Sequence, residues 1–217
     1  MGAVSRLTLC RSGAIAGFVS VLLMISGIVF VASLDLPYES PAALMVSAIE
    51  EKRESLGAGV FLFALAGAVL LWFLGALHEV LRRAEGGTGS LSSVALAAGS
   101  LWAFLWVLYA AMVYSGFELM GYYNDPQGAK TAGPLAFNTL VSPIAMLLPS
   151  VLLVATAVLS IRHQGLPRWL GWTSAALAGL LVLGSALGTV FGGPAILLGM
   201  AFPLWVLVTS AALLRRQ

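Results

Sequence analysis

The sequence predicts an all-α polytopic membrane protein, a bundle of six transmembrane helices, on three observations. Of its 217 residues, 60% are hydrophobic and only 9% are charged, whereas a soluble domain averages about 25% charged residues. The apolar residues gather in six stretches, each close to the ~20 residues that a helix needs to cross a bilayer. Most charged residues fall between these stretches. Soluble and disordered classes are therefore excluded.

Each stretch is expected to be helical, because the bilayer core offers the backbone no hydrogen-bond partner. A membrane barrel would need alternating polar residues, which these runs lack. Too few residues remain outside them for a second domain, so residues 1–217 are expected to form one transmembrane domain. The predicted spans are 13–34, 57–77, 91–115, 134–161, 169–190 and 194–214.

The connections between the spans carry signals of their own. The first span exceeds the apolar core of about 7–15 residues in a signal peptide, and is expected to be retained. In the loop after it, Ser40 and Pro41 favour a helix start, and residues 42–55 predict a short outer helix on the membrane surface. The glycine-rich segment 86–89 predicts a turn, after which Ser90 is expected to cap the third span.

Basic residues in the short loops predict that the N- and C-termini are both cytoplasmic, since Lys and Arg concentrate on the inner side. With the N-terminus inside, the outer segments hold only Lys52, Arg53 and Lys130. The inner arginines are Arg6, Arg11, Arg82, Arg83, Arg162, Arg168, Arg215 and Arg216. The expected localisation is a bacterial plasma (inner) membrane, with anionic lipid headgroups as partners of these inner arginines.

No Asp, Glu, Lys, Arg or His lies near the middle of a predicted span, where proton relays, voltage sensors and retinal sites carry one. We expect no metal site and no cofactor, because two histidines and one cysteine make a poor ligand set. The sequence also lacks an extended basic surface for nucleic acid. The alternative of an interfacial enzyme depends on an inner cluster of His78, Glu79 and His163.

The third span carries Trp102, Trp106 and Tyr109 on one helical face. Tryptophan usually prefers the membrane interface, so this deep face is expected to turn inward. With Ser150 and Trp205 at similar depth, it is a candidate pocket for an apolar or lipid-like ligand, although bundle packing or lipid contact is the favoured interpretation.

The lack of ionisable residues in the membrane core favours a non-enzymatic protein that binds lipid or a partner protein, and prolines in two spans leave a small transporter or channel as the alternative. Pro143 and Pro149 lie in the fourth span, and Pro203 lies in the sixth. Broken helices of this kind bind substrates in transporters, although proline is also common in membrane helices for packing alone.

Glycines at a spacing of four favour close helix contacts, within the bundle or between subunits. These glycines are Gly13, Gly17, Gly184, Gly188 and Gly192. Their spacing is compatible with a homo-oligomer or with a protein partner. On the outer side, Glu118 and Asp125 flank a Tyr-Tyr-Asn turn. These two acids are expected to bind a cation or a basic partner, or to form a solvated rim.

Three segments resemble a group of six-span bacterial membrane proteins, of actinobacterial type, whose function is unknown. They are residues 71–86, residues 166–172 and the closing Leu-Leu-Arg-Arg of residues 213–216. The resemblance covers nearly the whole chain and implies a plasma-membrane protein with six spans. It transfers no catalytic residue, and His78 stands where such a sequence would carry arginine.

Overall fold

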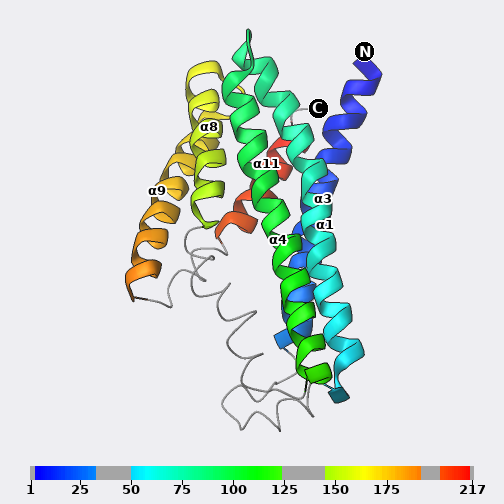
Figure 1. The fold of residues 1–217 in the computed structure, drawn as a ribbon. Coiled ribbons are helices and arrows are strands. Elements are labelled where there is room, and N and C mark those ends of the chain that lie inside the picture. Colours follow the sequence, from blue (N-terminus) through cyan, green and yellow to red (C-terminus); the bar gives the residue numbers. More distant parts are fainter. Residues whose placement is uncertain (1–2, 33–49, 124–144, 192–200, 216–217) are drawn as a thin grey trace.

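The computed structural model describes residues 3–32, 50–123, 145–191 and 201–215 (Figure 1). Within these ranges the chain forms six helices and no strand, which confirms the all-helical prediction. The helices are α1 (Ala3–Ala32), α3 (Arg53–Glu85), α4 (Ser90–Tyr123), α8 (Leu147–His163), α9 (Arg168–Phe191) and α11 (Ala201–Arg215).

Four segments of these helices are long and apolar enough to cross a membrane. They are Cys10–Phe30, Arg53–Glu85, Ser90–Ser115 and Arg168–Leu187. The apolar helices α8 and α11 are shorter as described, and the predicted spans 134–161 and 194–214 are described only from residues 145 and 201 onward. The composition and length of the helices are those of a helical membrane protein.

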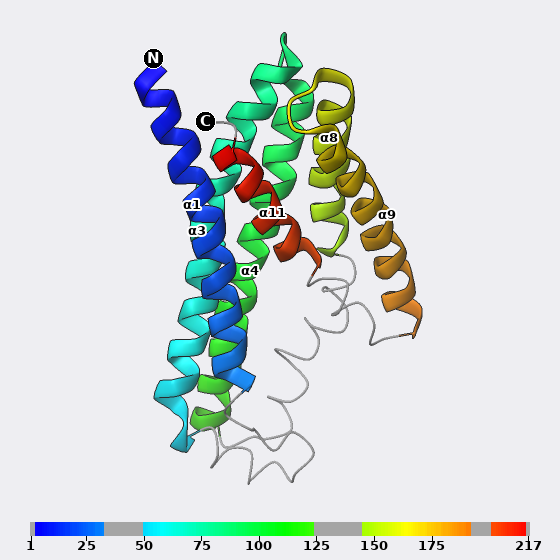
Figure 2. The ribbon, with the colours of Figure 1, turned by 180° about the vertical axis from the view of Figure 1, so that it is seen from behind.

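The bundle has two parts, which meet mainly where α8 packs on α4. On one side α1, α3 and α4 run side by side, and on the other α8 packs against both α4 and α9. Figure 2 shows α11 crossing the bundle between α1 and the α8–α9 pair. With 33 residues, α3 is about 50 Å long at a rise of ~1.5 Å per residue. It therefore exceeds a hydrocarbon core of about 30 Å and must tilt or extend beyond it.

Two tight turns lie at the end of the bundle where α1 begins (Figure 1). The turn between α3 and α4 contains Gly86, Gly87 and Gly89 at φ 54°, 135° and 69°, a region that favours glycine. The turn between α8 and α9 begins at Gln164, which adopts φ 54° and follows the last residue of α8. The last turn of α11 points towards the same end (Figure 1).

The outer surface of the bundle is as apolar as its core. Phe73, Leu74 and Leu153 are buried between helices, but Phe61 and Trp72 are 65% and 62% exposed. A large apolar patch of this kind is unusual on a monomer surrounded by water, and it is what lipid tails would cover.

Only the last part of the predicted outer helix 42–55 is described. Glu50 and Glu51 are helical, Lys52 forms a turn, and α3 begins at Arg53. Residues 53–55 are therefore part of the same helix as the second predicted span, and residues 42–49 lie outside the described ranges.

Candidate functional site

Aromatic rings from three helices form a continuous row through the bundle. Phe63 of α3 stacks on Trp106 with ring centroids 5.0 Å apart and meets Tyr109 edge-on at 5.9 Å. Trp106 lies 6.0 Å from Trp102, whose ring in turn lies 6.2 Å from that of Phe202 on α11. Edge-to-face and offset contacts at these separations are the arrangements that aromatic rings prefer.

The row ends in a hydrogen bond to α9. Phe202 stacks on Trp205 at 5.7 Å, and the indole N–H of Trp205 donates to the Ser174 hydroxyl at 2.8 Å. The Ser174 hydroxyl donates in turn to the Leu170 carbonyl at 2.7 Å. We call the six rings of Phe63, Trp102, Trp106, Tyr109, Phe202 and Trp205 the aromatic row. It links α3, α4 and α11, and the Trp205 bond ties α11 to α9.

One indole in the row, that of Trp102, has no hydrogen-bond partner in the described ranges. Trp102 is 7% exposed, and its Nε1 finds no acceptor among the described residues. The buried hydroxyls of Thr209 and Ser210 on α11 also lack partners in that part of the chain. Burying such a group without a hydrogen bond costs free energy, so the N–H of Trp102 and the N–H of Trp205 are not equivalent.

The predicted pocket residues therefore lie mostly in one row. Trp102, Trp106, Tyr109 and Trp205 each contact another ring of the row, and the pocket itself stays a prediction. Ser150 is bonded elsewhere, since its hydroxyl donates to the Leu147 carbonyl of its own helix at 2.6 Å.

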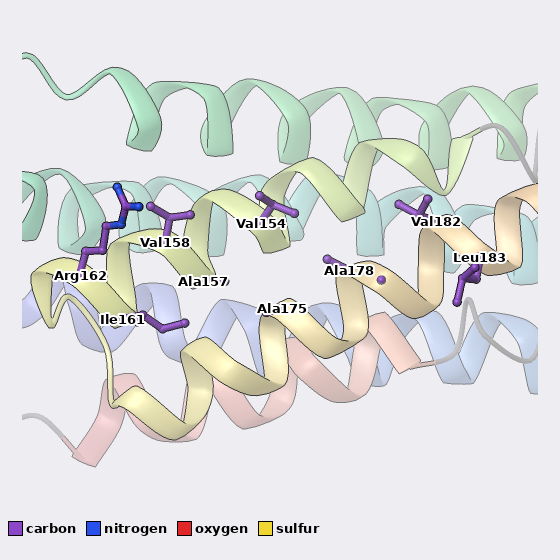
Figure 3. A pocket seen from close by; sticks show the side chains of 10 residues that line it. Val154, Ala157, Val158, Ile161, Arg162, Ala175, Ala178, Val182 and Leu183 are labelled. Carbon is purple, nitrogen blue, oxygen red and sulfur yellow. The ribbon is translucent and has the colours of Figure 1, made fainter.

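An open groove lies between α8 and α9, away from the aromatic row (Figure 3). It encloses about 630 Å³ and is lined by apolar side chains except at one end, where Arg162 stands. The apolar lining comes from Val154, Ala157, Val158, Ile161, Ala175, Ala178, Gly179, Val182 and Leu183.

The His and Glu residues of the predicted inner cluster are not bonded to one another in the described part of the chain. The Nδ1–H of His78 donates to the Ser92 carbonyl at 3.0 Å, and Glu79 forms an ion pair with Arg83 at 2.7 Å. His163 is exposed at the last position of α8. Within the described ranges, no three His, Cys, Asp or Glu side chains come together as metal ligands.

Glu85 caps α4 across the glycine turn. Its carboxylate accepts the backbone N–H groups of Leu91 and Ser92, each at 2.9 Å, and the Ser90 hydroxyl at 3.3 Å. These bonds, first of all the one from Ser92, lower the pKa of Glu85 to about 2. The cap expected of Ser90 is therefore supplied by Glu85, the last residue of α3, which lies beyond the predicted span 57–77.

Glycines bring α1 into close contact with its neighbours. A Cβ atom on Gly13 would overlap the side chain of Ala76 on α3, and one on Gly17 would overlap Ser210 of α11 and lie 2.8 Å from Phe73 Cδ2. Gly184 is buried in α9. Only the backbone position of Gly188 in α9 is described, and Gly192 lies outside the described residues.

The predicted outer acids fall largely beyond the described part of the chain. Glu118 is described only as a backbone position in α4, and Asp125 lies outside the described residues. Sequence reasoning missed Phe63, Phe202 and Ser174 as links of the aromatic row and Glu85 as a cap. The apolar surroundings of the two phenylalanines gave no signal, whereas the acid before a glycine turn could have suggested the cap.

Comparison of the chain with protein-family models, with curated proteins and with solved structures finds no match.

Proposed function

We propose that this chain is a six-span bacterial plasma-membrane protein with both termini in the cytoplasm, and that it binds lipid or a partner protein rather than catalysing a reaction. The single observation that carries this proposal is where its ionisable side chains lie. Among the described residues, the acids, bases and histidines lie near helix ends, while the middle of the bundle holds apolar side chains, aromatic rings and hydroxyls.

The hydroxyls in α8 support a binding protein over a transporter. Thr156 donates to the Leu152 carbonyl at 2.8 Å and Ser160 to the Thr156 carbonyl at 2.7 Å, so both bond within their own helix. Pro149 and Pro203 are each the third residue of a described helix. A proline in the first turn removes no hydrogen bond from its helix, and this holds for Pro149 because a turn at Met146 precedes α8. The residues before α11, and Pro143, lie outside the described ranges.

The orientation is supported by the ends of the helices. Arg82 and Arg83 lie before the α3–α4 turn, Arg162 and Arg168 flank the α8–α9 turn, and Arg215 ends α11. These ends and the start of α1 face the same way (Figure 1). Because arginine is retained on the cytoplasmic side, this arrangement favours that side for all of them.

Cysteine labelling tests the topology, because the chain contains a single cysteine, Cys10. In a Cys10→Ser background, Glu51→Cys is expected to react with a membrane-impermeant maleimide added to intact spheroplasts. Thr88→Cys is expected to react only after the membrane is permeabilised. The reverse pattern, or equal labelling of the two positions, contradicts the proposed orientation.

Native mass spectrometry of the protein in nanodiscs tests the binding function. We expect a stoichiometric lipid or partner protein to remain bound after delipidation in mild detergent. A bare chain that nevertheless transports a solute or turns over a substrate in proteoliposomes would overturn the proposal. A bare chain without such activity would also contradict it.

A further inference from the structure

We propose that the groove between α8 and α9 holds one acyl chain of an anionic phospholipid from the inner leaflet, with the lipid phosphate at Arg162. This inference rests on the proposed function and names its ligand. Figure 3 shows Arg162 at one end of the groove and Val182 and Leu183 at the other.

Small residues create the groove. Ala157 of α8 and Ala175, Ala178 and Gly179 of α9 all line it. A Cβ atom added to Gly179 would meet no atom within 4 Å. Larger side chains on both helices, Val154 and Leu183 among them, stand beside this hollow at 51% and 61% exposure. The groove is thus shaped for a narrow apolar chain and opens towards the surroundings of the bundle.

The groove matches the depth of one leaflet. At its inner end the two helices touch, since a Cβ on Gly171 would lie 2.8 Å from Ile161 Cγ1. Leu183 lies twelve residues further along α9, about 18 Å at a rise of ~1.5 Å per residue. Half of a hydrocarbon core of about 30 Å is of the same size.

Charge complementarity selects an anionic lipid. Arg162 is exposed and, among the described residues, is the only charged one that lines the groove. It forms no ion pair with any residue in the described ranges, so its guanidinium is available for a phosphate, which it can bind through two parallel hydrogen bonds. Trp169 and Trp172, 53% and 67% exposed at the start of α9, are placed where tryptophans line a membrane interface.

Binding of defined lipids tests the assignment. The delipidated protein is titrated with phosphatidylglycerol or with zwitterionic phosphatidylcholine, and bound lipid is counted by native mass spectrometry. We expect one phosphatidylglycerol to bind more tightly than phosphatidylcholine. Arg162→Gln is expected to weaken phosphatidylglycerol binding about tenfold, as loss of a charge-assisted hydrogen bond would, and to weaken phosphatidylcholine binding less, because the choline cation offsets the charge of its phosphate.

Two variants separate the groove from general lipid contact. Gly179→Leu would fill the hollow and is expected to abolish binding of both lipids at this site. Gly75→Leu is its matched control, because Gly75 is also an outward helical glycine with no atom within 4 Å of an added Cβ. Arg215→Gln is the control for Arg162→Gln, since it removes an exposed charge from α11. Both controls are expected to bind as the wild type does.

The outcomes distinguish this inference from the proposed function. If wild-type protein retains a lipid but Arg162→Gln and Gly179→Leu do not alter its binding, the groove assignment fails while a lipid-binding function stands. If Gly179→Leu instead dissociates an oligomer, the groove is an interface between copies and the assignment is overturned. If the wild type retains neither lipid nor partner protein, both proposals fail.

Discussion

The aromatic row and the α8–α9 groove differ in how side chains fill the space between apolar helices. In the row, rings from α3, α4 and α11 contact one another between the helices. In the groove, alanines and a glycine leave about 630 Å³ that side chains do not fill. Large aromatic residues thus contact one another in the row, and small residues line the groove.

The largest expected effect comes from breaking the aromatic row at Phe202. This side chain is 2% exposed and contacts Trp102 and Trp205. Phe202→Ala is expected to lower the free energy of unfolding by about 3–5 kcal/mol, because it removes these contacts and leaves a cavity. Thermal unfolding in mild detergent, followed by tryptophan fluorescence, measures the loss.

The matched control for this change is Phe104→Ala on the outer face of α4, where the side chain is 58% exposed. We expect it to change the melting temperature little. Equal losses at Phe104 and Phe202 would mean that the row contributes no more to stability than the lipid-facing surface.

A smaller effect on stability is expected when a closely packed glycine, Gly17, or a groove glycine, Gly179, is replaced by leucine. Gly17→Leu places a side chain against Phe73 and Ser210, and overpacking of this kind costs about 1–3 kcal/mol. Gly179→Leu enters open space and is expected to preserve or raise stability, since leucine favours a helix over glycine by about 1 kcal/mol. The melting temperatures of the two variants in detergent provide the measurement. A comparable loss in Gly179→Leu would show that the groove is closed in solution.

The two buried indoles sharpen the picture of the row. Trp205 donates to Ser174 at 2.8 Å, whereas the N–H of Trp102 has no acceptor among the described residues. The substitutions Trp205→Phe and Trp102→Phe remove similar volume, so the difference between their losses of unfolding free energy reports the hydrogen bond. We expect Trp205→Phe to be about 1 kcal/mol more destabilising than Trp102→Phe. Denaturation of both variants, with Ser174→Ala alongside, measures this difference, and equal values would contradict the role of the bond.

The helices could be predicted from the sequence because each long apolar run must satisfy its own backbone in lipid. The third-span face could also be predicted, since Trp102, Trp106 and Tyr109 recur at helical spacing. Six spans, their orientation and the bound ligand stay predictions.

The partners of these residues could not be predicted. Phe63 and Phe202 lie in helices that are apolar all round, so no periodic pattern separates their inward faces from the lipid-facing ones. For the same reason the small residues of the groove, such as Ala157 and Gly179, do not stand out in the sequence. The Trp205–Ser174 bond joins residues 31 positions apart, and only the packing of α11 on α9 brings them together.

The smallest expected effect on stability concerns the turn between α3 and α4, where Glu85 caps α4. The α8–α9 turn beside the groove is different, because a left-handed Gln164 closes α8 and Pro167 precedes α9. Hydrogen bonds from Ser92 and Leu91 lower the pKa of Glu85 from 4.5 to about 2. A pKa lowered by folding means that the carboxylate stabilises the fold fully above pH 4.5 and loses this contribution as the pH falls through about 2.

Melting temperatures of wild type and Glu85→Gln, recorded from pH 5 to pH 2, test this cap. We expect the wild type to lose more stability than Glu85→Gln over this range, because the amide cannot titrate. The other described acids occur in both proteins, so their titration cancels in the comparison. Parallel curves would mean that the carboxylate does not hold the start of α4, and the α3–α4 turn would then depend on its other bonds, such as the one from His78 to the Ser92 carbonyl.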